Sequence, residues 1–244
     1  MTSAGGPGGP PGLEPAADTI RPLAVAFDLN ETLTDLAPVA ELFRRLELGP
    51  AGVPWWFAVL LRDGMALAAA GGAADFADLA RGALEEIAGA SGRPLPDGVG
   101  DQLVDALGAA PLHPDVAPAL ELLHGSGVPA FVLTNGSAPL ARRILGAAGV
   151  THLLVDVLSV DAVGHAKPRP EPYHHAAEVA GVPPGRMALV AVHPWDVHGA
   201  SSAGLSTGWV DRRARPYPVV FTPPTVRAPD LPGVVERLLA LPTP

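Results

Sequence analysis

Cysteine is absent from the 244-residue sequence, which excludes disulfides, thiolate metal sites and a cysteine nucleophile. Charged residues make up only 17% of the chain and the net charge is −9, so the basic surface needed to bind nucleic acid is missing. No apolar run approaches the roughly 18 residues of a membrane span. The N-terminus also lacks a basic start followed by an apolar stretch, so we expect no signal peptide and a cytoplasmic protein.

Three residue types that are common in most proteins are rare here. The chain contains one lysine, Lys167, two asparagines, Asn30 and Asn135, and two tyrosines, Tyr173 and Tyr217. The composition is dominated by Ala, Gly, Pro, Leu, Val and Arg, which fill positions that have no special requirement. A disfavoured residue that remains is therefore a candidate for a chemical role, and this applies to the lysine, both asparagines and Tyr173.

The pattern of apolar residues changes twice along the chain. Residues 1–19 are rich in Gly and Pro and predict a disordered tail. Apolar residues recur at helical spacing across 38–110, which predicts about four helices. Afterwards strand-like runs alternate with helical segments, as in a parallel sheet with helices on both faces. We predict an α/β fold with a Rossmann-like parallel sheet core, residues 20–37 and 111–244, and an inserted helical cap domain.

Polar residues follow the apolar runs that predict the strands of the sheet, which are 23–27, 128–133, 153–158, 187–192 and 207–211. Asp28 follows the first run, Thr134 and Asn135 the second, Lys167 lies in the loop after the third, and His193 and Asp196 follow the fourth. The carboxyl ends of parallel strands meet at one edge of a sheet, where such folds bind ligands. Each residue taken alone also suits a helix N-cap or a turn.

The segments around these residues resemble the four motifs of the haloacid dehalogenase superfamily. The first motif is matched by Phe27-Asp-Leu-Asn-Glu-Thr-Leu33 and the second by Leu133-Thr-Asn-Gly136. The third and fourth are matched by Lys167-Pro-Arg-Pro-Glu-Pro-Tyr173 and Val190-Ala-Val-His-Pro-Trp-Asp196, in the forms seen in type II 2-haloacid dehalogenases. The resemblance covers roughly residues 22–213 and implies the core and cap arrangement of that superfamily.

This resemblance implies a hydrolase with an aspartate nucleophile. Asp28 would attack C2 of a small 2-halo acid, expel halide and form an ester that water then hydrolyses. The Lys167 ammonium would keep Asp28 ionised. Asp196 would orient the water or hold Lys167. Thr32, the threonine of the first motif, is a further candidate for contact with the substrate.

The resemblance also suggests how an anionic substrate would be bound. Thr134 and the Asn135 amide would donate hydrogen bonds to the substrate carboxylate or to the nucleophile, and both also suit a helix N-terminus. Arg62 loosely matches a cap arginine that binds halide or carboxylate in the dehalogenases. Tyr173 matches the tyrosine that follows their lysine motif. The alternatives are a solvated arginine and a core tyrosine.

Several positions depart from the patterns of the family. The superfamily's phosphatases carry an acid at the position of Asn30, and an amide cannot supply a proton in that way. They also bind Mg²⁺ partly through an acidic residue where this chain has Val192, so we expect no metal cofactor. Ala191 and His193 replace small polar residues of the dehalogenases. We include Asn30 and His193 among the candidate substrate-binding residues; His193 could be a base, a substrate ligand or a turn residue.

Three functions therefore stay open: a cofactor-independent dehalogenase, which we favour, a Mg²⁺-dependent phosphatase of the same superfamily, and a catalytically silent binding protein with this fold. The adjacent His174 and His175 lie on different helix faces and do not form a chelating pair. The expected partner is a small anionic molecule, and a homodimer is a further expectation.

Overall fold

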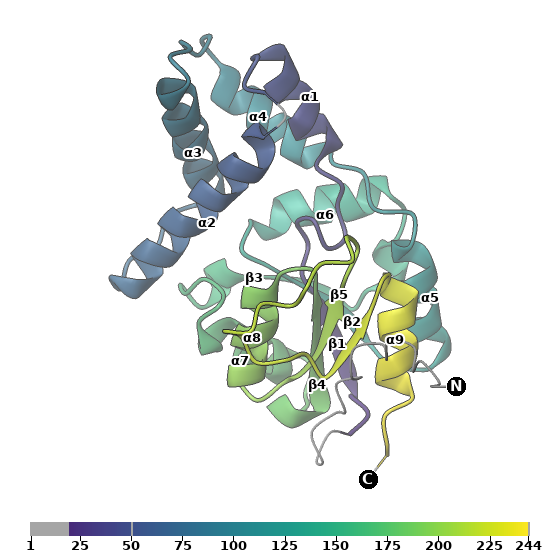
Figure 1. Ribbon diagram of the computed structural model, residues 1–244. Helices are drawn as coiled ribbons and strands as arrows, with labels where there is room; N and C mark the ends of the chain where they lie inside the picture. The colour runs from purple at the N-terminus through teal and green to yellow at the C-terminus, as the bar shows by residue number, and fades with distance from the viewer. Residues whose placement is uncertain (1–19, 50, 244) are drawn as a thin grey trace, which may run out of the picture.

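A computed structural model describes residues 20–49 and 51–243, so the predicted tail at 1–19 lies outside the described residues. The described part contains one parallel sheet of six strands in the order β3-β2-β1-β4-β5-β6 (Figure 1). The strands are β1 (Ala24–Phe27), β2 (Ala130–Thr134), β3 (Asp156–Ser159), β4 (Met187–Ala191), β5 (Ser206–Val210) and β6 (Val226–Ala228). β1 pairs with both β2 and β4 and so occupies the centre of the sheet.

Helices cover both faces of this sheet. On one face lie α5 (Val116–Gly125), α6 (Ala138–Ala147) and α9 (Leu231–Leu239), and on the other α7 (Pro170–Val179) and α8 (Pro194–Ser202). Successive β1 side chains point to opposite faces. Val25 and Phe27 accordingly join the first core, whereas Ala24 and Ala26 join the second. Burial on both faces explains the uninterrupted apolar runs of the strands and confirms the predicted α/β fold.

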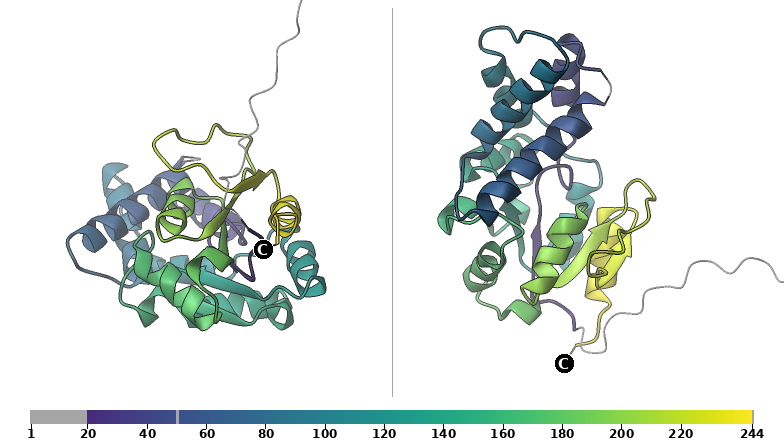
Figure 2. Two further views of the ribbon diagram at one scale, coloured as in Figure 1. Left: turned by 90° about the horizontal axis from the view of Figure 1, so that it is seen from below. Right: turned by 60° about the vertical axis from the view of Figure 1, so that its left-hand side comes forward.

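Four helices lie between β1 and α5: α1 (Ala37–Arg45), α2 (Gly52–Ala69), α3 (Phe76–Ala90) and α4 (Val99–Gly108). They form a layer of their own beyond one end of the sheet (Figure 2) and share a separate hydrophobic core. Trp56 is fully buried there; its indole Nε1 donates to the Ala80 carbonyl at 2.8 Å, and its ring meets the edge of Phe43. The indole hydrogen bond satisfies the one polar group that burying a tryptophan brings.

Apart from shifts of one or two residues at strand ends, the structure differs from the predicted strands in two places. The third strand begins at Asp156 rather than at 153, because Thr151–Leu153 forms a turn of 3₁₀-helix. The sixth strand, Val226–Ala228, is too short to leave a pattern in the sequence, and its middle residue, Arg227, is exposed at the edge of the sheet. None of the described helices is long and apolar enough to cross a membrane.

Candidate active site

The centre of the site is the buried ammonium of Lys167, which bridges two carboxylates. Its Nζ donates to Asp28 Oδ1 at 2.9 Å, to Asp196 Oδ2 at 2.6 Å and to the Leu133 carbonyl at 2.9 Å. All three hydrogens of the ammonium are therefore used. The loops after β1 and β3 and the first turn of α8 thus bring together three residues, of which Asp28 and Asp196 are more than a hundred positions apart in the chain.

Charge pairing fixes the protonation of Asp28 and Lys167. Burial alone raises the pKa of the Asp28 carboxyl, but the Lys167 ammonium and the His193 hydrogen bond outweigh it and hold that pKa well below its usual range. Burial likewise lowers the pKa of Lys167, and Asp196 and Asp28 outweigh that effect and raise it. At neutral pH Asp28 is a carboxylate and Lys167 an ammonium, which is the state that nucleophilic attack by Asp28 requires.

Asp196 has both carboxylate oxygens engaged. Oδ2 accepts from Lys167, and Oδ1 accepts from the Tyr173 hydroxyl at 2.6 Å. Burial raises the pKa of Asp196 despite the opposing ammonium of Lys167. Burial also raises the pKa of Tyr173 well above its usual value, so its hydroxyl stays a donor. Asp196, in the first turn of α8, thus holds the lysine in place and is held in turn by Tyr173 from α7.

Thr32 links Asp28 to the backbone just after β4 by hydrogen bonds. Its hydroxyl donates to Asp28 Oδ2 at 2.7 Å and accepts from the backbone N–H of Val192 at 3.1 Å. The side chain is fully buried. Thr32 therefore orients Asp28 and sets its distance from the loop after β4.

The side-chain amide of Asn135 makes two hydrogen bonds with the backbone of Lys167. Its Oδ1 accepts from the Lys167 N–H at 2.9 Å, and its Nδ2 donates to the Lys167 carbonyl at 3.3 Å. The Thr134 hydroxyl accepts from the N–H of Gly136 at 2.9 Å. Both side chains thus have partners within the protein: Asn135 positions the loop that carries the lysine, and Thr134 shapes the turn after β2. The predicted hydrogen bonds of Thr134 and Asn135 to substrate stay predictions.

His193 contacts the nucleophile through one ring nitrogen and Glu31 through the other. Its Nδ1 lies 3.1 Å from Asp28 Oδ2, and its Nε2 lies 3.1 Å from Glu31 Oε2. Burial lowers the pKa of His193, but the hydrogen bonds with Asp28 and Glu31 dominate and raise it to about 9. At neutral pH the ring is therefore an imidazolium that donates to both carboxylates.

Two aromatic rings flank this imidazolium. Phe57 of α2 stacks on it with ring centroids 5.5 Å apart, and Trp195 of α8 stacks on it at 5.4 Å. Phe57 is thus a direct contact between the helical layer and the residues that surround Asp28. Cation–π attraction adds to the stability of such a stack.

Glu31 and Phe57 are contacts of the site that the sequence patterns did not indicate. Glu31 sits in the turn after β1 with φ of +59°, a left-handed conformation that is uncommon outside glycine. This turn directs the carboxylate to His193, and Arg213 lies 3.5 Å from its other oxygen. The position of Glu31 inside the first motif was the available signal.

Arg62 and Asn30 are not brought into this cluster. The Arg62 guanidinium, 55% exposed, binds Asp63 at 2.7 Å and Glu86 at 2.6 Å. Asn30 is half-buried in the loop after β1, where its backbone pairs with Thr34, and within the described residues its amide makes no hydrogen bond. Their roles in substrate binding stay predictions.

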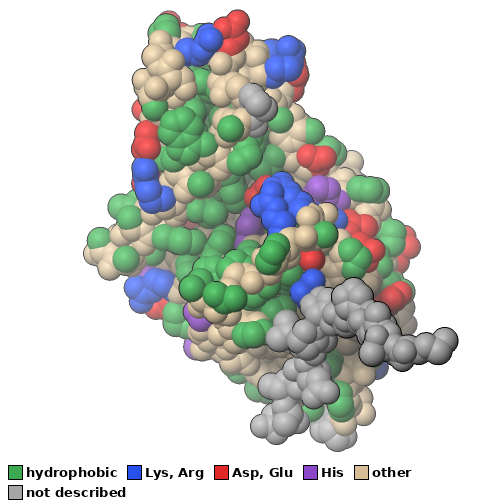
Figure 3. All heavy atoms as spheres, in the orientation of Figure 1, with side chains coloured by type: hydrophobic (Ala, Val, Ile, Leu, Met, Phe, Trp, Pro, Cys, Tyr) green, Lys and Arg blue, Asp and Glu red, His purple; other side chains and the backbone are tan. Residues whose placement is uncertain are grey.

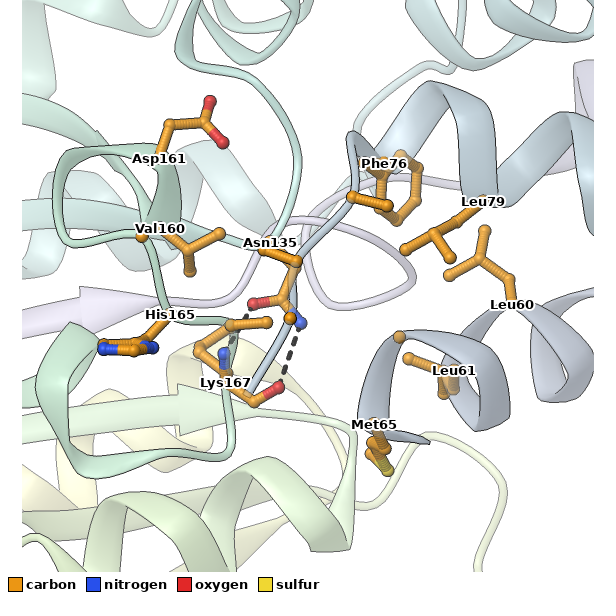
Figure 4. Close-up of a pocket in the computed structure, with 16 residues that line it drawn as sticks. Leu60, Leu61, Met65, Phe76, Leu79, Asn135, Val160, Asp161, His165 and Lys167 are labelled. Carbon is orange, nitrogen blue, oxygen red and sulfur yellow. Dashed lines mark hydrogen bonds between the residues drawn. The ribbon is translucent and has the colours of Figure 1, made fainter. Parts of the chain in front are cut away.

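A pocket adjoins the cluster between the helical layer and the loops after β2 and β3 (Figure 4). Asn135 and Lys167 line one side, and the side toward α2 and α3 is apolar, with Leu60, Leu61, Met65, Phe76 and Leu79. On the molecular surface, hydrophobic side chains gather in a hollow beside basic and histidine side chains (Figure 3). Such a pocket suits a small molecule with an apolar part and a polar group.

The described residues contain no group of three His, Asp or Glu side chains placed to hold a metal ion. The space between the Asp28 and Asp196 carboxylates is bridged instead by the ammonium of Lys167. A fixed positive charge thus already lies between the two carboxylates.

Comparison with known proteins shows the family. A family model described as haloacid dehalogenase-like hydrolase matches residues 22–204. The (S)-2-haloacid dehalogenase of Xanthobacter autotrophicus is 30% identical over 191 residues, which cover 78% of this chain and 75% of that protein. A solved structure of an L-2-haloacid dehalogenase from Xanthobacter autotrophicus with chloropropionic acid covalently bound superposes with a TM-score of 0.82 at 25% identity, covering 90% of this chain and 99% of that one.

Other matches are shorter. Those with two (S)-2-haloacid dehalogenases of a Pseudomonas species span only 62% and 43% of the lengths of those proteins. A phosphoserine phosphatase of Thermus thermophilus is 38% identical over 43% of each chain. Since the family match covers most of the chain, including all four motifs around Asp28, Thr134, Lys167 and Asp196, the protein belongs to the haloacid dehalogenase-like hydrolases.

Proposed function

We propose that the protein is a hydrolase that removes halide from a small 2-haloalkanoic acid, with Asp28 as the nucleophile. The observation that carries this proposal is the buried, ionised Asp28 carboxylate, fixed by Lys167 and Thr32 beside a partly apolar pocket. A related protein has been captured with chloropropionic acid covalently bound, which is the kind of adduct that this chemistry forms.

The proposed reaction has two steps. An Asp28 oxygen attacks C2 of the substrate, and halide leaves with the electrons of the carbon–halogen bond, which produces an ester. Water then attacks the ester carbonyl carbon and releases the 2-hydroxy acid with Asp28 restored. Asp196 accepts from Lys167 through one oxygen and from Tyr173 through the other, which supports a role in holding Lys167.

The helices of residues 38–110 act in this proposal as a cap over the carboxyl ends of the strands. Phe57 reaches His193, and apolar residues of α2 and α3 line the pocket, which supports that role. Arg62 is proposed to bind the substrate carboxylate or the halide after leaving Asp63 and Glu86. The reaction as proposed uses no cofactor. Location in the cytoplasm and a homodimer stay predictions from the sequence.

The second candidate function is that of a Mg²⁺-dependent phosphatase, because the chain is also similar to a phosphoserine phosphatase. The alcohol that leaves when a phosphate ester is cleaved needs a proton from a general acid. This chain has an amide, Asn30, at the corresponding position. Halide needs no such acid. This difference favours the dehalogenase.

The decisive experiment is halide release from L-2-chloropropionate and chloroacetate, with and without chelator. We expect release that the chelator does not change, and its loss in Asp28→Asn, because an amide is a poor nucleophile. The control is Asp101→Asn, whose carboxylate is 81% exposed in the helical layer. In ¹⁸O water the label should enter the Asp28 side chain. Absence of halide release, beside magnesium-dependent hydrolysis of a phosphate ester, would replace the dehalogenase by the phosphatase.

A further inference from the structure

His193 and Glu31 have no role in the two steps as described so far. Yet the imidazole is buried, contacts both the nucleophile and a second carboxylate, and is stacked on two aromatic rings. Such constraint on a titratable ring next to the reacting group is typical of functional sites.

We propose that His193 is the base that activates the water for hydrolysis of the Asp28 ester, and that Glu31 is the positioning residue that orients it. This inference rests on the proposed dehalogenation, since it concerns the second step of that reaction.

The two ring nitrogens of His193 face different groups. Nδ1 faces the Asp28 carboxylate at 3.1 Å, next to the carbon that the water must attack. Nε2 faces Glu31 at 3.1 Å, which keeps a proton on Nε2. With that tautomer fixed, loss of the other proton leaves a lone pair on Nδ1 directed at the ester. A carboxylate that orients a histidine base in this way recurs in hydrolases.

The other carboxylate of the site is already engaged by the protein. Asp196 accepts from Lys167 at 2.6 Å and from Tyr173 at 2.6 Å, so a water bound there would have to use the second lone pair of one of these oxygens. His193 keeps one nitrogen at the reacting group once the Asp28 carboxylate has been consumed.

Formation of the ester also changes the charge on His193. In the free enzyme the Asp28 and Glu31 carboxylates together hold the ring as an imidazolium. Esterification removes the negative charge of Asp28, so only Glu31 still favours the cation. Arg213 lies 3.5 Å from Glu31, and Lys167, which stays paired with Asp196, lies 6.0 Å from the Trp195 ring that stacks on His193. Both cations disfavour a further positive charge on the ring. The ring then releases its Nδ1 proton to solvent as the halide departs.

Protons and electrons balance over the cycle. In the second step the neutral Nδ1 takes a proton from water while the oxygen forms a bond to the ester carbonyl carbon. The carbon–oxygen bond to the alcohol breaks, and the alkoxide takes the remaining proton of the added hydroxyl. The products are the 2-hydroxy acid, the Asp28 carboxylate and the His193 imidazolium. The proton released in the first step accounts for the net acid formed with the halide.

The test separates the two steps in His193→Gln, with His152→Gln as the matched control because that side chain is exposed. Under single turnover with L-2-chloropropionate, halide and the Asp28 adduct are followed by rapid quench and mass spectrometry. We expect His193→Gln to release one equivalent of halide and then accumulate the ester, with hydrolysis slowed by about 10²–10⁴-fold. Wild type and His152→Gln should accumulate little ester.

Glu31→Gln provides a second, milder variant, in a half-buried turn. We expect ester hydrolysis to be slower, and its rise with pH to move to lower pH, because the amide no longer stabilises the imidazolium. Glu31→Asp should restore part of the rate. Circular dichroism establishes that each variant is folded.

The outcomes are distinct. If wild type forms no Asp28 adduct and releases no halide, the proposed function and this inference both fail. If wild type reacts but His193→Gln hydrolyses the ester at the wild-type rate, or loses the halide-releasing step instead, only the role of His193 is overturned. A pH profile unchanged in Glu31→Gln would remove Glu31 from the pair.

Discussion

Replacing Lys167 by methionine tests the electrostatic core of the site independently of any substrate. Methionine has a similar length and no charge. The change removes three hydrogen bonds at 2.6–2.9 Å, and it leaves Asp28 and Asp196 buried without the cation that bridges them. It also leaves the Leu133 carbonyl without its partner.

The expected loss of stability follows from these contacts. Breaking a buried ion pair by removing one partner costs about 3–5 kcal/mol. For a protein of this size, 1 kcal/mol corresponds to about 2–4 °C in Tm, so the midpoint should fall by about 6–20 °C. Arg44→Met is the matched control, because Arg44 pairs with Glu41 at the surface, where both side chains are more than half exposed. An exposed pair contributes at most about 1 kcal/mol.

The loss should depend on pH. In the wild type the pKa of Asp28 is lowered by folding, so its stabilising contribution is present above the unfolded value, near pH 4, and is lost as the pH falls through the folded value. Without the ammonium, burial and mutual repulsion raise the pKa of both carboxylates in the folded state. The penalty in Lys167→Met is then largest at pH 8 and shrinks as acid protonates one of them.

Thermal unfolding followed by circular dichroism at pH 8 and pH 5 measures both effects. The difference in Tm between wild type and Lys167→Met should be clearly smaller at pH 5, while that for Arg44→Met stays near zero at both. A variant as stable as wild type at pH 8, or a difference that is constant between the two pH values, would refute the reasoning.

Three further changes test other parts of the site. Tyr173→Phe removes a 2.6 Å hydrogen bond to the buried Asp196 carboxylate and should lower the free energy of unfolding by about 1.5–3 kcal/mol in urea titration. Gly199→Ala should cost about 1–3 kcal/mol in the same assay, since an added Cβ would lie 2.6 Å from the Tyr173 hydroxyl and 2.7 Å from Pro168 Cβ. Asn30→Asp should leave halide release unchanged or lower, because a further carboxylate in the loop after Asp28 repels an anionic substrate. A hundredfold gain of phosphatase activity without halide release from either form would contradict the dehalogenase.

The fold and the charged centre of the site could be predicted because both leave strong local signals. Apolar runs marked five strands, and a polar residue at the end of a central parallel strand has only one edge at which to lie. Asp28, Lys167 and Asp196 were therefore expected at one edge, and the resemblance implied the pairing of Lys167 with Asp28. In the structure the Lys167 ammonium lies within 2.9 Å of both carboxylates. The sixth strand left no comparable signal over its three residues.

The partners of His193 could not be predicted in the same way, because they depend on a turn and on a contact between layers. Glu31 reaches the ring only because its backbone adopts φ of +59°, which no pattern of hydrophobicity encodes. In the sequence Phe57 is indistinguishable from the other apolar residues of α2. Its contact with His193 depends on how the helical layer packs against the sheet domain. A motif therefore predicts which residues surround the nucleophile, whereas the protonation of the histidine beside it depends on these two contacts. For that reason the departure at His193 can be interpreted chemically only with the three-dimensional arrangement in hand.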